Sequence, residues 1–109
     1  MTDTTKVLAQ LNPAATTLTT LYTVPALTSA VVSSLVICNQ SATDITFRLS
    51  IQIAAAADDP KQYLYYDLPL VANDTFVATI GVTLAASDVI KVYASSTSVS
   101  FSAFGVEVT

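Results

Sequence analysis

Apolar and polar residues alternate most regularly in residues 44–53, where every second side chain is large and apolar. Because successive side chains of a β-strand point to opposite faces, this period of two predicts a strand with one buried and one solvent-facing side. Residues 30–39 are apolar at positions of both parities, which predicts a central strand. Residues 39–42 (NQSA) predict a turn that joins the two segments as a hairpin.

Strand-like runs recur along the chain at intervals of about ten residues, a spacing typical of antiparallel sandwiches and barrels. The predicted strands are residues 18–24, 30–39, 44–53, 62–68, 75–84, 89–95 and 99–108. A chain of 109 residues has room for one core. We therefore predict an all-β protein, a single antiparallel β-sandwich of about seven strands over residues 18–109. A jelly-roll-like and an immunoglobulin-like strand order both fit the pattern.

Residues 1–17 are polar and irregular, and Pro13 interrupts any continuous helix or central strand there. The part from Lys6 to Leu11 has the length of a short helical turn but no strong apolar stripe. We predict an extended N-terminal arm, which either packs over the edge of the sandwich or reaches to a neighbouring subunit.

Two of the predicted strands lead to specific predictions about which side chains share a face. In residues 99–108 the apolar positions change parity between Phe101 and Phe104, so we predict a bulge near Ala103 that restores one apolar face. In residues 62–68 a regular strand would place Leu64, Tyr66 and Leu68 on one face, and Tyr63, Tyr65 and Asp67 on the other.

Charged residues make up only 11% of the chain, and the net charge is −4. Ordinary soluble domains carry about 25% charged residues, so hydroxyls and contacts with other protein must cover much of the surface. The four basic residues, Lys6, Arg48, Lys61 and Lys91, lie far apart in the sequence. Because nucleic-acid binding requires clustered positive charge, we predict no nucleic-acid partner.

The sequence offers little material for catalysis. It contains no His, so a Ser or Cys nucleophile lacks its usual base. The lone Cys38 lies in an apolar run, which predicts a buried small side chain. Asp58 and Asp59, with Asp67 nearby, are candidates for Ca²⁺ binding or glycoside hydrolysis, although Asp is also typical of solvated turns. We predict no enzymatic activity, no cofactor and no metal site.

No apolar run approaches the roughly 18 residues of a membrane-spanning helix, and the first residues do not resemble a secretion signal. We therefore predict no membrane association and synthesis in the cytoplasm, where a single unpaired Cys is ordinary.

The tyrosines supply much of the aromatic surface. Tyr63, Tyr65 and Tyr66, with Tyr22 and Tyr93, could form a platform on which sugar rings stack. Tyr also combines apolar area with a hydroxyl, which suits a sandwich core or a subunit interface. Both interpretations stay open, and core or interface is favoured because the chain contains no Trp.

Several strand and turn segments resemble small virion structural proteins of tailed bacteriophages. They are residues 19–25 (TTLYTVP), 30–39 (AVVSSLVICN), 63–67 (YLYYD), 73–76 (NDTF) and 85–95 (AASDVIKVYAS), with the strand 101–107. The resemblance covers most of the chain from Leu18 onward. It implies a virion protein made in the host cytoplasm, and it brings no catalytic residues.

The function that the resemblance implies is capsid decoration, or cementing, at junctions between subunits of the major capsid protein, commonly by a homotrimer. The expected interface residues are Lys6, Leu8, Leu11, Pro13, Tyr22, Tyr63, Tyr65 and Tyr66. Strand pairing between the arm and a neighbour's sheet edge would add to the burial of apolar surface. The alternative is a fibre or adaptor module associated with the tail or baseplate, with binding of a receptor glycan as a further option. A free-standing lectin-like domain is a third possibility.

Overall fold

The computed structural model describes residues 2–109, which form nine β-strands and two short 3-10 helices. The strands are β1 (Asp3–Leu11), β2 (Thr19–Thr23), β3 (Ser29–Asn39), β4 (Ile45–Gln52), β5 (Tyr63–Leu70), β6 (Thr75–Ala78), β7 (Val82–Leu84), β8 (Val89–Ala94) and β9 (Val99–Val108). The helices η1 (Ile53–Ala55) and η2 (Pro60–Gln62) lie between β4 and β5. Among these residues no helix is long and apolar enough to cross a membrane. The predicted all-β fold is confirmed.

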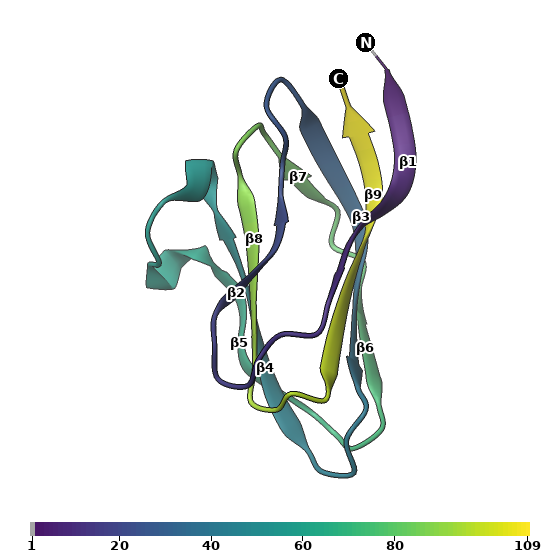
Figure 1. Cartoon of the computed structure of the whole chain (residues 1–109), viewed down its shortest axis with the longest axis vertical. Coiled ribbons are helices and arrows are strands. Elements are labelled where there is room, and N and C mark those ends of the chain that lie inside the picture. The colour runs from purple at the N-terminus through teal and green to yellow at the C-terminus, as the bar shows by residue number, and fades with distance from the viewer. Residues whose placement is uncertain (1) are drawn as a thin grey trace.

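The strands form two antiparallel sheets that face each other (Figure 1). Sheet A has the order β1-β9-β3-β6, with β7 also pairing β3, and sheet B has the order β2-β8-β4-β5. The strands pair from the two ends of the chain inward: β1 with β9, β2 with β8, β3 with β6 and β7, and β4 with β5. This is the strand order of a jelly roll, one of the two orders that the sequence left open.

The core lies between the sheets and is filled by the inward side chains of both. Among the largest fully buried side chains are Leu35, Ile37 and Phe101 from sheet A, and Phe47, Leu49 and Ile90 from sheet B. Phe47 and Phe101 meet across the core with ring centroids 6.3 Å apart. Burying each such side chain contributes about 1.5–3 kcal/mol, so this layer holds the two sheets together.

Strands β3 and β4 are confirmed, but they do not form the predicted hairpin. β3 is central in sheet A, whereas β4 belongs to sheet B. The side chain of Asn39, at the end of β3, is 1% exposed and donates to the backbone carbonyls of Thr43 at 2.9 Å and Leu70 at 3.2 Å. These hydrogen bonds satisfy the buried amide of Asn39 at the corner where the chain passes from sheet A to sheet B.

The N-terminal segment takes one of the two places predicted for it, the edge of the sandwich. Residues 3–11 are extended there as β1, which is hydrogen-bonded to β9, and the helical turn considered for residues 6–11 is wrong. The register shifts at Leu8, so that Leu8 is buried while Val7 is exposed, and this bulge hides the period of two. Thr2 and Thr109 exchange two backbone hydrogen bonds, so the chain ends lie side by side (Figure 1).

The predicted strand over residues 75–84 is divided into β6 and β7. β6 pairs with residues 35–38 of β3 and β7 with residues 30–32. Gly81 lies at the break with a φ of 62°, a conformation that glycine adopts without steric cost. This division, together with β1, accounts for nine strands in place of about seven.

The bulge predicted near Ala103 of β9 is wrong. The register shifts lie in the partner strands, around Ser33 of β3 and Leu8 of β1, and β9 itself alternates regularly. Its odd-numbered positions up to Ala103 are buried, while Phe104 and Val106 lie in register with side chains on the outer face of sheet A. The change of parity therefore arises because β9 carries apolar side chains on both faces of sheet A: those up to Ala103 face the core, and Phe104 and Val106 face outward.

Candidate functional site

A bulge in β5 builds an aromatic and charged cluster on the outer face of sheet B. Two residues of β5, Tyr66 and Asp67, lie opposite the single residue Arg48 of β4. Asp67 has a φ of 52°, a left-handed conformation that Asp tolerates better than most residues. A second register shift, at Leu64, turns Tyr63 to the outer face while Tyr65 packs against the core, so Tyr63 and Tyr66 share the outer face. The regular alternation predicted for residues 62–68 is therefore wrong.

The guanidinium of Arg48 is held on three sides. Its Cζ lies 4.2 Å from the ring centroid of Tyr66 and 4.2 Å from that of Tyr93, its cross-strand neighbour on β8. Its Nε donates to Asp67 Oδ1 at 2.6 Å, and its Nη2 donates to Oδ2 at 3.2 Å. These bonds raise the pKa of Arg48 and lower the pKa of Asp67. Two cation–π contacts and a forked ion pair thus fix the guanidinium.

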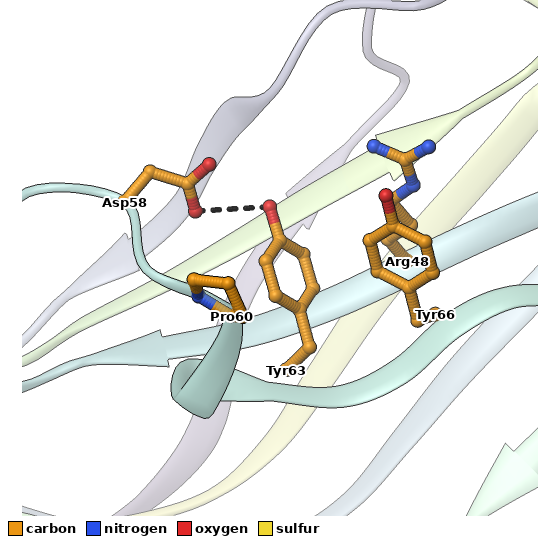
Figure 2. A pocket seen from close by; sticks show the side chains of 5 residues that line it. All are labelled: Arg48, Asp58, Pro60, Tyr63 and Tyr66. Carbon is orange, nitrogen blue, oxygen red and sulfur yellow. Dashed lines mark hydrogen bonds between the residues drawn. The ribbon is translucent and has the colours of Figure 1, made fainter.

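An open pocket of about 460 Å³ lies beside this cluster, lined by Arg48, Asp58, Pro60, Tyr63 and Tyr66 (Figure 2). The rings of Tyr63 and Tyr66 meet edge to face with centroids 5.2 Å apart. The Tyr63 hydroxyl donates to Asp58 Oδ1 at 2.9 Å. Partial burial, followed by this hydrogen bond, raises the pKa of Tyr63. Tyr66 is 60% exposed, so the pocket offers aromatic surface between a cation and a carboxylate.

The rim of the pocket is held by a turn at the start of η2. The side chain of Asp59 accepts a hydrogen bond from a backbone N–H of the turn, and Gln62 accepts one from the backbone N–H of Asp59 at 3.0 Å. This reciprocal capping satisfies two N–H groups and fixes the position of Pro60.

The three carboxylates considered for metal binding have different partners in the fold. Asp58 accepts from Tyr63, Asp59 caps η2 and Asp67 pairs with Arg48. Within residues 2–109 no group of three or more His, Cys, Asp or Glu side chains is placed to hold a metal ion.

The outer face of sheet A is a second distinctive surface. Its side chains lie in cross-strand rows: Thr5, Val106, Val31 and Thr83; Val7, Phe104 and Ser34; Gln10, Ser102, Val36 and Val77. Val7, Val31 and Val77 are 49%, 40% and 55% exposed. Contiguous exposed apolar side chains on a folded domain mark an interaction surface.

Within residues 2–109 these rows contain no charged side chain. Asp3, which pairs with Val108, lies beyond them at the end of sheet A. The side chains of Lys6 and Glu107 lie on the opposite face of sheet A. There Lys6 Nζ donates to Glu107 Oε1 at 3.1 Å, and the Tyr22 hydroxyl of sheet B donates to Oε2 at 2.5 Å. The bond from Tyr22, followed by that from Lys6, lowers the pKa of Glu107. Burial, followed by the bond to Glu107, raises the pKa of Tyr22.

The eight predicted interface residues are scattered over the fold. Leu8, Pro13 and Tyr22 are buried in the chain itself, and Leu11 and Tyr65 pack against the core, so these five offer little surface to a partner. Lys6 is exposed at the edge of sheet A. Only Tyr63 and Tyr66 come together at one site, the pocket on sheet B.

Arg48 and Asp58 were not predicted to share a site with the tyrosines. Arg48 occupies a polar position of the most regular strand in a chain with only four basic residues, which was a usable signal. The outer valines of sheet A were also missed. Val7 lies in the segment predicted to be an arm, and the apolar residues of both parities around Val31 were interpreted only as the sign of a central strand.

Comparisons with models of known protein families, with curated proteins and with solved structures find no match for this chain. The pocket on sheet B and the outer face of sheet A are therefore the features of the chain that point to its function.

Proposed function

We propose that the chain is a non-enzymatic structural component of a bacteriophage virion, a capsid decoration protein that docks on the head through the outer face of sheet A. The observation that carries the proposal is the set of cross-strand rows on that face, which contain exposed valines and hydroxyls and no charged side chain. Jelly rolls serve as viral capsid domains and as lectins, so the fold is compatible with the role without selecting it. The segments that resemble small virion proteins add support.

The size of this face fits one modest contact. Four strands spaced by about 4.8 Å and about 30 Å long present roughly 600 Å². A standard interface buries about 800 Å² on each partner. One copy would therefore bind a capsid subunit weakly, and a homotrimer would bind a symmetric shell more tightly because its second and third contacts are intramolecular.

The chemistry of the face favours protein over a charged partner. With a net charge of −4, the chain repels other acidic surfaces, and an uncharged face avoids that repulsion at the contact. Apolar contact also predicts that binding changes little between low and high salt. This docking replaces pairing by a free arm, because β1 is already hydrogen-bonded to β9.

The location of the chain on purified phage particles tests the proposal directly. Gold-labelled antibody against the chain should decorate heads in electron micrographs. Label confined to the tail tip would contradict decoration and favour the tail or fibre alternative. Particles without label would contradict any virion role.

A pair of variants tests the docking face itself. In Val31→Asp/Val77→Asp each new carboxylate would be buried unpaired at the contact, which costs about 2–5 kcal/mol and lowers particle binding at least about 30-fold. Leu64→Asp on β5 of sheet B, where Leu64 is 45% exposed, is the matched control and should bind normally. Co-sedimentation with particles measures both, and equal binding by the two variants would contradict the proposed face.

A further inference from the structure

We propose that the pocket beside Tyr63 and Tyr66 on sheet B is a binding site for a neutral carbohydrate. This inference does not rest on the proposed capsid role, because the pocket and the docking face lie on different sheets. Figure 2 shows the arrangement, with Tyr63 between Asp58 and Pro60 on one side and Tyr66 and Arg48 on the other.

The shape and the aromatic lining suit one or two sugar rings. The volume of about 460 Å³ lies within the range of small-ligand pockets, which is about 300–1,000 Å³. A pyranose presents a face of C–H groups, and these meet the electron-rich face of a tyrosine ring favourably. Tyr66 is 60% exposed and stands at right angles to Tyr63. The two rings thus form a corner rather than a flat patch.

The polar groups match the hydroxyls of a sugar. The guanidinium of Arg48 has five N–H donors, of which Asp67 receives two, so the remaining donors can serve a ligand oxygen. Asp58 accepts the Tyr63 hydroxyl through Oδ1, and a carboxylate has further acceptor capacity on both oxygens. A donor and an acceptor that flank aromatic rings can engage neighbouring hydroxyls, each of which both donates and accepts.

The site is held in place before any ligand arrives. Arg48 is stacked between Tyr66 and Tyr93 and anchored by Asp67, and these residues lie on strands. The rim residue Pro60 is fixed by the capped turn of η2. Groups that are already ordered lose little conformational freedom on binding, which favours affinity for a small ligand.

The charges favour a neutral sugar over an acidic one. Arg48 is balanced by Asp67, and Asp58 leaves the site with one net negative charge. A carboxylate on the ligand would be repelled by Asp58, and Asp67 already occupies the forked side of Arg48. Uronic and sialic acids are therefore disfavoured relative to neutral hexoses and N-acetylhexosamines.

Saturation-transfer NMR on the native chain tests the site, with glucose, galactose, mannose, N-acetylglucosamine, glucuronic acid and N-acetylneuraminic acid as probes. At least one neutral sugar should receive saturation, chiefly at the protons of one ring face. Neither acidic sugar should bind more tightly. No transfer to any neutral sugar, or tighter binding of an acidic one, would overturn the inference.

Two variants assign the binding to this pocket. Tyr66→Ala removes the exposed ring and should weaken binding of the neutral sugar about tenfold or more, a change of about 1.4 kcal/mol. Val77→Ala on sheet A removes a comparable exposed apolar side chain and should leave sugar binding unchanged. Circular dichroism checks that both are folded. Unchanged sugar binding by Tyr66→Ala would overturn the assignment.

The same variants separate this inference from the proposed function. Val31→Asp/Val77→Asp should lose particle binding and keep sugar binding, whereas Tyr66→Ala should do the reverse. Loss of particle binding in Tyr66→Ala with sugar binding intact would show that the tyrosines contact protein, and it would overturn the carbohydrate site.

Discussion

The outer faces of the two sheets are built from similar alternating strands, yet they differ in chemistry. Sheet A presents valines and hydroxyls without charge, whereas sheet B presents Arg48 between two tyrosines and a pocket with a carboxylate at its rim. A broad uncharged face suits contact with another protein. A concave site with a few fixed polar groups suits a small ligand. Alternation of apolar and polar residues thus identifies a strand but does not indicate what kind of partner its outer face binds.

The largest expected loss of stability comes from Gly105→Ala, which should disrupt the pairing of two central strands of sheet A. A Cβ at Gly105 would lie 2.0 Å from the carbonyl oxygen of Val31 and 3.0 Å from the Cα of Val32, both in the backbone of β3. The two central strands would have to separate. We expect a loss of about 3 kcal/mol or more in the free energy of unfolding, measured by urea denaturation followed by circular dichroism.

Gly81→Ala is the matched control. A Cβ there meets no atom within 4 Å, and only the φ of 62° opposes it. The expected loss is about 1–2 kcal/mol. If Gly105→Ala were no more harmful than Gly81→Ala, the close approach of β9 to β3 would be contradicted.

A smaller effect is expected at Glu107, which links the edges of the two sheets through Lys6 and Tyr22. Its pKa is lowered in the folded chain, so the unfolded chain takes up its proton first as the pH falls. The stabilisation by the carboxylate is therefore present above its ordinary pKa of 4.5 and lost as the pH falls through the lowered value. We expect it to amount to about 1–2 kcal/mol.

Glu107→Gln isolates this contribution. The variant should be less stable than the native chain at pH 7, and the difference should shrink as the pH falls below 4.5. Urea midpoints at several pH values measure it. A difference between the two chains that stays constant with pH would contradict the role of the charge.

The smallest effect concerns the cluster on sheet B. Arg48→Lys keeps the charge but loses the planar fork and the double stacking, so we expect a loss of about 0.5–1 kcal/mol in stability. Lys91→Ala, on the neighbouring strand β8, is the control and should change stability less. Equal stability of Arg48→Lys and the native chain would indicate that the stack adds nothing to the fold.

Much of the fold could be predicted because period-two alternation is a local property of the chain. Residues 44–53 and 30–39 became β4 and β3 as expected. The pairing of strands could not be predicted in the same way, because the corner at Asn39 depends on carbonyls of residues far along the sequence, such as Leu70. β1 was missed because its bulge at Leu8 interrupts the alternation and its partner β9 lies at the other end of the chain.

The candidate sites were partly predictable. The sequence pointed to Tyr63 and Tyr66, but their shared face depends on a register shift at Leu64, and the place of Asp67 beside Arg48 depends on a second bulge; alternation reveals neither. The outer face of sheet A, the proposed docking face, was missed for a different reason. Phe104 continues a regular strand, and two bulges in its partners were mistaken for one in β9.

Docking through the outer face of sheet A can be tested at a cysteine that the native chain already carries. Cys38, the only cysteine, does not lie in the core as predicted but is half-buried in a row of this face with Ser100 and Thr75. The measurement is the rate at which Cys38 reacts with a thiol reagent, free in solution and bound to phage particles. A Cys38→Ser/Leu64→Cys variant, which carries its single thiol on β5, reports the same rate on sheet B.

If sheet A docks on the particle, binding slows the reaction of Cys38 to the rate set by the unbound fraction. The thiol of the variant on sheet B should react equally fast in both states. Equal rates at Cys38 in the free and bound states would contradict the claim.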